Sequence, residues 1–214
     1  FSAQPKIRRK FMDIELSKCS KTYMFTLNEY YRVLKQRNAY LKNEKINREY
    51  LYVLDEKCAE LQSIIIHQRY KFLQDLMEIS SSFYKQLSMD HTEMSLIYKT
   101  FIPINDQSKM KEDILKVYDD NFERDLFLKT TDKGIHKDDF KIMINDKEAE
   151  EFASQGQKRT ILLALKVGIV KLIEKIIKDE PILLLDDVLS ELDKHRQNYL
   201  LDSIRDVQTL ITCT

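Results

Sequence analysis

The scarcity of glycine and proline is the feature that most constrains the fold of this chain. Three Gly and three Pro occur among 214 residues, and because these residues usually interrupt helices and form tight turns, we expect long helices with few breaks. Between residues 16 and 41, and again from Leu51 onward, apolar residues recur at steps typical of helix faces. The charged segment 42–50 is predicted to connect two antiparallel helices. An intermolecular coiled coil is the alternative, but the repeat is too irregular for a heptad seam.

Charge and cysteine content exclude several classes of protein. Lys plus Arg (35) equals Asp plus Glu (35), so the net charge gives no bulk attraction to nucleic acid or to a membrane, and any basic patch must be local. The three cysteines are far apart and form no C-x-x-C pair, which argues against a disulfide framework and a zinc site. No apolar run approaches the roughly 20 residues of a membrane span, and no signal peptide is evident. We therefore expect a cytoplasmic protein with no membrane partner, and the missing initiator Met predicts a fragment.

The middle of the chain changes from a helical to a mixed pattern. Short strands are predicted from β-branched and aromatic content at residues 96–104, 126–131 and 140–144. The last of these is followed by an Asn-Asp turn signal at residues 145–146.

The final third alternates between helix and strand. An apolar helix, a buried strand, an amphipathic helix and a second buried strand are predicted at residues 161–177, 182–185, 191–204 and 209–214. Continuous apolar strands separated by a helix are typical of a parallel sheet covered by helices. The predicted fold is therefore an α/β lobe plus a helical arm, with a mainly helical arm domain in residues 1–125 and the α/β lobe in residues 126–214.

The segment that opens the apolar helix is a candidate anion site. It reads Ser154, Gln155, Gly156, Gln157. A glycine at a helix start permits close backbone approach, and the first N–H groups of a helix point outward without partners. The alternative is a capping box, which Ser154 and Gln157 satisfy without any ligand.

Two carboxylates follow the predicted strand at residues 182–185. Asp186 and Asp187 would stand where a parallel strand delivers side chains into a ligand crevice. Such a pair can hold Mg²⁺ and orient an attacking water. The alternative is that both residues only terminate the strand, and Ser190 with Asp193 can likewise be read as a helix cap.

The order and spacing of these three signals resemble the signature loop, Walker B strand and D-loop of ABC-type ATPases. The P-loop pattern G-x-x-x-x-G-K-[ST] does not occur, because none of the three glycines precedes a Lys. In ABC-type heads the P-loop lies in an N-terminal lobe, so the resemblance implies that this chain supplies the C-terminal lobe and only part of an ATP site.

The residues within these motifs resemble those of the RecF family of DNA replication and repair proteins. Residues 154–160 read SQGQKRT and residues 183–193 read LLLDDVLSELD, while PKIRRKFMD at residues 5–13 is similar to that family's S-P-x-x-R-R-x-F-L-D. The family's T-T-x-G-P-H-R-D-D appears at residues 130–139 as TTDKGIHKDD, with one residue more. Because of that departure, no specific role is carried over to His136 or Lys137.

The resemblance implies an ATP-dependent DNA-binding protein of recombinational repair, with the family's links to DNA damage and the SOS response. It would act with RecR and RecO at gapped DNA, a single-strand/double-strand junction or a duplex, as a homodimer that sandwiches ATP and Mg²⁺ and hydrolyses ATP slowly.

Implied roles follow for the matching residues. The segment from Ser154 through Gln155 and Gly156 to Gln157 would contact ATP across the dimer, Asp186 would help hold Mg²⁺, Asp187 would polarise water, and Ser190 with Asp193 would couple the two sites. Candidate DNA contacts are Arg8, Arg9, Lys10, Lys158 and Arg159, for each of which a solvated charge or an internal pair is the alternative.

Two rival interpretations have other consequences. An SMC-like head also binds ATP but carries a far longer coiled coil than this arm allows. A helical scaffold without nucleotide chemistry would use the same motifs only as caps, and a P-loop upstream of Phe1 would exclude it.

Overall fold

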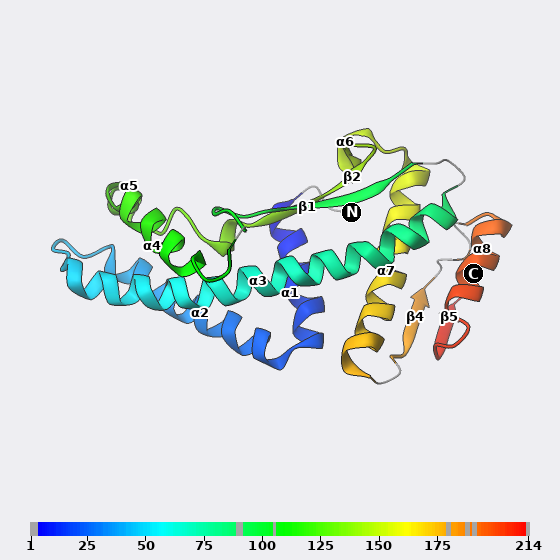
Figure 1. Cartoon of the computed structure of the whole chain (residues 1–214), viewed down its shortest axis with the longest axis horizontal. Helices are drawn as coiled ribbons and strands as arrows, with labels where there is room; N and C mark the ends of the chain where they lie inside the picture. The colour runs from blue at the N-terminus through cyan, green and yellow to red at the C-terminus, as the bar shows by residue number, and fades with distance from the viewer. Residues whose placement is uncertain are drawn as a thin grey trace. The chain divides into compact units, whose positions relative to one another are not determined.

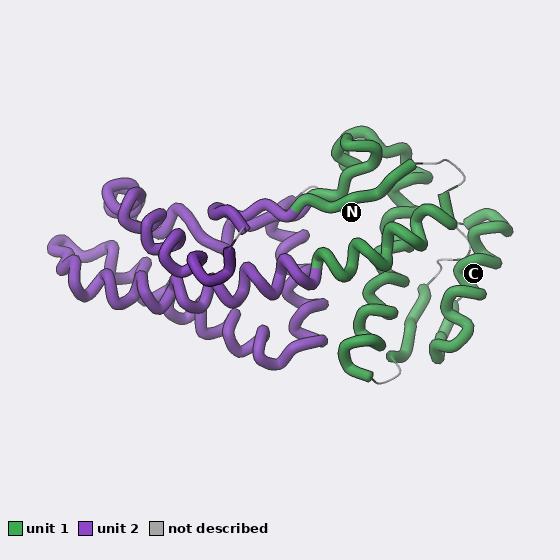
Figure 2. Tube along the Cα trace, in the orientation of Figure 1, with its two compact units in different colours: residues 1, 73–97, 141–214 green, residues 2–72, 98–140 purple. Residues whose placement is uncertain are grey.

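The computed structural model describes residues 4–88, 92–104, 106–178, 181–186, 189 and 192–212. The chain forms two compact units (Figure 2). Unit 1 contains residues 73–97 and 141–214, and unit 2 contains residues 2–72 and 98–140. The longest described helix, α3 (Arg48–Leu87), contributes to both units, and the boundary expected between residues 125 and 126 stays a prediction.

Unit 2 is mainly helical (Figure 1). Its helices are α1 (Pro5–Cys19), α2 (Lys21–Tyr40), the first part of α3, α4 (Met110–Asp120), α5 (Phe122–Leu128) and the short 3₁₀ helix η1 (Ile135–Lys137). Extended backbone at Ser20 separates α1 from α2, and its side chain caps α2 by accepting the Tyr23 N–H at 3.1 Å. The predicted helical hairpin is confirmed, with α2 and α3 joined by residues 41–47.

One predicted strand of this unit is wrong. Residues 126–131 were expected to be extended, but α5 continues to Leu128 and ends at Lys129, which has φ 53°. The reason is tertiary, since the buried Asp125 carboxylate in α5 accepts the Asp132 N–H at 2.8 Å and a hydrogen bond from Arg37 at 2.6 Å. These bonds fix the segment as the last turn of a helix followed by a reversal.

Unit 1 contains most of two small sheets. In the first, the order is β1 (Met94–Lys99), β2 (Asp139–Ile144), β3 (Lys147–Glu148). The strand and turn predicted at residues 140–146 are confirmed, because β2 and β3 pair antiparallel around Asn145 and Asp146, which have φ values of 46° and 62°. The strand predicted at residues 96–104 lies earlier, at β1.

The second sheet pairs β4 (Leu183–Asp186) with β5 (Thr209–Thr212) in parallel, as predicted, with Leu183 opposite Thr209. Helix α8 (Lys194–Ser203) connects the two strands in sequence, and α6 (Ala149–Phe152) and α7 (Gln155–Ile177) precede them. The apolar core of this unit consists of Leu87, Leu163, Val167, Val170, Leu183, Leu185, Leu200, Ile204 and Val207.

The expectation of fully buried strands is wrong for β4 and β5. Leu183 and Leu185 are buried, but Leu184 is 70% exposed and Leu210 is 60% exposed. Among the described residues, helices cover one face of this sheet and leave the other open, so burial alternates along each strand. Within the same described part of the chain, no helix is both long and apolar enough to span a bilayer.

Candidate functional site

The first turn of α7 forms the capping box that the sequence allowed. Ser154 Oγ accepts the Gln157 N–H at 3.2 Å, and Gln157 Oε1 accepts the Ser154 N–H at 2.9 Å. The first helical backbone bond runs from the Lys158 N–H to the Ser154 carbonyl. The N–H groups of Gln155 and Gly156 therefore precede the hydrogen-bonded turns, as at any helix start, and both residues are exposed.

Gly156 is not required by the packing of this chain. A Cβ atom placed there would meet only Ser154 Oγ, at 4.0 Å, and the residue does not have positive φ. A missing side chain at an exposed helix start is useful when another molecule must approach the backbone closely. The capping box and an anion site are thus compatible, since capping occupies the Gln157 N–H and leaves the outermost donors exposed.

Asp186 lies at the end of β4. It is exposed, and its Oδ1 accepts the Thr212 hydroxyl at 2.5 Å from the neighbouring strand. The hydrogen bond orients the carboxylate at the carboxyl end of both parallel strands, where α/β folds bind ligands. Asp187 and Ser190 lie outside the described residues.

Asp193 is the N-cap of α8, which confirms for this residue the helix-cap interpretation given as the alternative to a D-loop role. Its carboxylate accepts the Arg196 N–H at 3.1 Å, and this hydrogen bond lowers the pKa of Asp193. The Gln197 amide then donates to the carbonyls of Leu189 and Leu192, at 2.7 and 3.0 Å. Gln197, which the sequence did not single out as a site residue, thus ties the backbone of Leu189 and Leu192 to the first turn of that helix.

The five candidate DNA contacts fall into different environments. Arg8 is 8% exposed and forms a bidentate pair with Asp139, both bonds measuring 2.7 Å. Its charge is therefore committed to an internal pair. Arg9 is half-buried and donates to the Asp138 carbonyl at 2.7 Å. The other three candidates are exposed or half-buried: Lys10, Lys158 and Arg159.

A buried arginine organises the residues around Asp138. Arg69 is fully buried and donates to Asp13 at 2.9 Å and to Asp138 Oδ2 at 2.9 Å. The Tyr98 hydroxyl donates to the same Asp138 oxygen at 2.5 Å. Burial raises the pKa of Asp138 to about 6, and Arg69 and Tyr98 oppose that rise.

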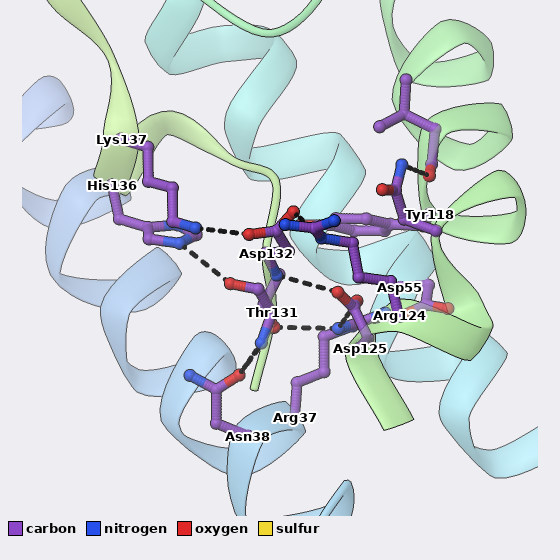
Figure 3. Close-up of polar contacts among 12 residues, drawn as sticks. Arg37, Asn38, Asp55, Tyr118, Arg124, Asp125, Thr131, Asp132, His136 and Lys137 are labelled. Atoms are coloured by element: carbon purple, nitrogen blue, oxygen red, sulfur yellow. Dashed lines mark hydrogen bonds and ion pairs between the residues drawn. The ribbon is translucent and has the colours of Figure 1, made fainter. Parts of the chain in front are cut away.

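A second buried arginine, Arg37, holds together the part of the network shown in Figure 3. It donates to Asp55 and to Asp125, each at 2.6 Å, and to the Thr131 hydroxyl at 2.8 Å. Asn38 Oδ1 accepts both the N–H and the hydroxyl of Thr131, at 2.8 and 2.6 Å. The segment 130–139 is therefore anchored to α2 and α3 by buried charge.

His136 and Lys137 belong to the same anchored segment. The His136 ring lies 3.2 Å from the Thr131 carbonyl and 2.9 Å from the Tyr30 hydroxyl, and burial lowers its pKa. Lys137 pairs with Asp132 at 2.7 Å (Figure 3). Across the described ranges no group of three or more His, Cys, Asp or Glu could hold a metal ion. These two side chains position the loop.

Sequence reasoning missed the central role of Arg37 and Arg69. The available signal was a cation within an apolar helix face, since Arg69 follows Ile65 by four residues and precedes Phe72 by three. A buried cation requires carboxylate partners. The partners could not be named, because Asp125 is 88 positions from Arg37.

No family model matches the chain. Similar proteins were found by sequence. The chain is 43% identical over 212 residues to the DNA replication and repair protein RecF of Streptococcus thermophilus, covering 98% of this chain and 58% of the relative. It is 40% identical over 210 residues to RecF of Clostridium perfringens, with the same two coverages.

Two solved structures have the same fold. They are described as the recombination mediator protein RecF with ATP and with ATPrS in the RecFOR pathway, with TM-scores of 0.90 and 0.88. Each is 32% identical to this chain and aligns with its whole length. The chain covers 58% of the structure with ATP and 59% of the structure with ATPrS. The predicted fold class, the C-terminal lobe of an ABC-type ATPase head with a helical arm, is confirmed. The chain spans less than two thirds of the relatives that it matches.

Proposed function

This chain belongs to the RecF family, and from that premise we propose that it carries the signature and Walker B side of an ATP site in a DNA-repair protein. The observation that carries the proposal is the exposed start of α7, where Gly156 serves no internal packing. A helix start with outward N–H groups and room for close approach suits the γ-phosphate of ATP bound by a second protomer. The relatives described with ATP or ATPrS support the choice of nucleotide.

Mg²⁺ is implied with ATP, and the residues fit that ion. Mg²⁺ prefers oxygen ligands, keeps several waters and is usually bound by one or two carboxylates together with substrate phosphates. Asp186 offers an exposed carboxylate whose Oδ1 is oriented by Thr212. Bound Mg²⁺ would neutralise charge on the phosphates. In this proposal Asp186 helps hold the ion, Asp187 polarises the attacking water, and Ser190 with Asp193 links the two sites of the dimer.

The proposed dimer explains why this lobe has only part of the site. Each ATP would be held by the P-loop of one protomer and by Ser154, Gln155, Gly156 and Gln157 of the other. Slow hydrolysis would keep the ATP-bound dimer on DNA as a clamp. RecR and RecO are the proposed mediators, in keeping with the RecFOR pathway named for the structural relatives, and the proposed location is the cytoplasm.

For DNA we retain Lys158, with Arg159 at lower priority. Arg9 and Lys10 are not retained, because together with apolar side chains they line a groove between α1 and α2. Arg8 is left out because Asp139 already holds its guanidinium on two sides. Phosphate contacts of this kind would make binding strongly dependent on salt.

The test is Ser154→Arg in the full-length protein. A bulky cation at the exposed α7 start should abolish ATP-induced dimerisation but leave ATP binding by each monomer intact, because the P-loop lies elsewhere. Sedimentation with and without ATP separates the two effects. Ser82→Arg, at an exposed helical serine of the same unit, is the matched control. If the Ser154 variant still dimerises on ATP, Ser154 is only a helix cap.

A further inference from the structure

A groove of about 840 Å³ lies between α1 and α2, entirely within unit 2. The two helices contact each other and are joined at Ser20 (Figure 1). Side chains from both helices line the groove. The volume falls in the range of known ligand sites, roughly 300 to 1,000 Å³. None of the residues assigned to the ATP site lines it.

One end of the groove is basic. We call the three cations that line it the basic end: Lys6, Arg9 and Lys10. Lys6 and Lys10 are exposed and have no ion-pair partner within the described part of the chain. Arg9 donates to a backbone carbonyl rather than to a carboxylate, so its charge is also not neutralised by an ion pair.

The other charges along the groove are already paired. Lys18 pairs with Glu15 at 2.9 Å. Asp13 is the acidic residue that lines the groove, and its carboxylate is held by Arg69 at 2.9 Å and by the Tyr23 hydroxyl at 2.5 Å. The unneutralised charge is therefore positive and is concentrated at the basic end.

Apolar side chains from both helices also line the groove, beside polar residues such as Ser17 and Asn28. We call these four apolar side chains the apolar floor: Ile14, Met24, Leu27 and Tyr31. Ile14 is 44% exposed and Tyr31 is 41% exposed. Met24, Leu27 and Tyr31 recur at three- and four-residue steps and so lie on one side of α2. Apolar side chains on a groove between helices are typical of sites that accept an amphipathic segment, and Met adapts to varied partners.

We propose that this groove is a docking site for an acidic amphipathic segment of a partner protein. Carboxylates of the segment would meet the basic end, and its apolar residues would cover the apolar floor. Helix α1 has 15 residues and is therefore about 22 Å long, enough for a segment of a few helical turns.

Charge complementarity selects the acidic character of the occupant, and the apolar floor selects protein over nucleic acid. A DNA strand needs cations spaced along its backbone and platforms for successive bases. Here the unpaired cations lie together on the first part of α1, and the remaining lining mixes apolar side chains with polar ones and offers no further unpaired Lys or Arg.

Fluorescence anisotropy of the full-length protein tests the proposal with a fluorescein-labelled helical peptide that carries Leu and Phe on one face and Glu near one end. Two control peptides replace Leu and Phe by Ser, or Glu by Gln. A labelled oligothymidine is the nucleic-acid arm. The expected result is binding of the acidic amphipathic peptide, with clearly weaker binding of both control peptides.

The variant Lys6→Glu with Lys10→Glu should weaken peptide binding about tenfold or more, because it places like charges opposite the peptide carboxylates. The matched control is Lys35→Glu with Lys71→Glu, which makes the same change in net charge at exposed positions of the same unit outside the groove. That control should bind as the parent does. Circular dichroism of both variants checks that the fold is kept.

Several outcomes overturn the inference. One is failure of the parent to bind the acidic peptide, and another is an equal loss in both double variants, which would indicate non-specific attraction. Equal binding of the Ser peptide would remove the apolar floor from the site. Oligothymidine binding that depends on the basic end, without peptide binding, would assign the groove to nucleic acid. A change in self-association on substituting the basic end would assign it to a second copy of the chain.

Discussion

Gly168 of α7 faces Ser80 of α3 so closely that a Cβ atom on the glycine would lie 2.1 Å from Ser80 Oγ. The two helices therefore approach each other at a point where α7 has no room for a side-chain atom. Ser80 is fully buried at this crossing.

Gly168→Ala should destabilise the protein by about 1 to 3 kcal/mol, the usual effect of overpacking a well-packed core. Urea unfolding measures the change in free energy of unfolding. Gly156→Ala is the matched control, because a Cβ there has 4.0 Å of clearance, and Ala in a helix is intrinsically favoured over Gly by up to about 1 kcal/mol. Equal losses of stability in the two variants would contradict the close crossing.

The buried Asp138 predicts a particular dependence of stability on pH. Its pKa rises from 3.8 to about 6 on folding, mainly through burial. The folded state thus binds a proton more tightly than the unfolded state, so this residue favours folding most below pH 4 and loses that contribution as pH rises toward 6 and above.

The measurement compares the free energy of unfolding of the parent with that of Asp138→Asn between pH 4 and pH 7. The parent should lose on the order of 1 to 3 kcal/mol relative to the variant across this window. The difference between the two curves removes other titrating groups, such as Asp55, whose pKa is also raised by burial. A flat difference would show that the Asp138 carboxyl does not change its protonation on folding.

Asp186 and Asp187 should have separable effects in the full-length protein. Asp186→Asn should weaken Mg²⁺·ATP binding, because an oxygen ligand of the ion loses its charge. Asp187→Asn should reduce hydrolysis while ATP binding and dimerisation remain, because the amide keeps the size but not the charge that polarises water. ATP affinity and single-turnover hydrolysis of both variants assign the pair. Parent-like hydrolysis by Asp187→Asn would contradict this division of roles.

The 214-residue chain by itself should bind ATP weakly or not at all. Its sequence contains no P-loop pattern, and the P-loop supplies most contacts to the triphosphate. Titration calorimetry with Mg²⁺·ATP is the measurement. Micromolar affinity would mean that the described lobe holds the nucleotide without a partner lobe, and the half-site proposal would fail.

Local rules of the sequence determined much of this fold. The long helices follow from apolar periodicity and from the lack of glycine and proline, and the turn at Asn145 and Asp146 follows from residues that tolerate positive φ. The capping box of α7 and the parallel pairing of β4 with β5 were also predicted, because both depend on short segments with strong local preferences.

Only the tertiary structure decided which partners the internal charges have. Arg8 precedes the buried Met12 by four residues, so periodicity places it on the buried face of α1, but its partner Asp139 lies 131 positions away and meets it only after folding. The tertiary structure also decided that α5 stays helical, because Arg37 fixes Asp125 there. It likewise decided that Leu184 is exposed, because the described helices cover only the other face of its sheet. Helical and strand periodicities are properties of neighbouring residues, whereas the partner of a buried charge and the cover of a sheet face come from segments that meet only after folding.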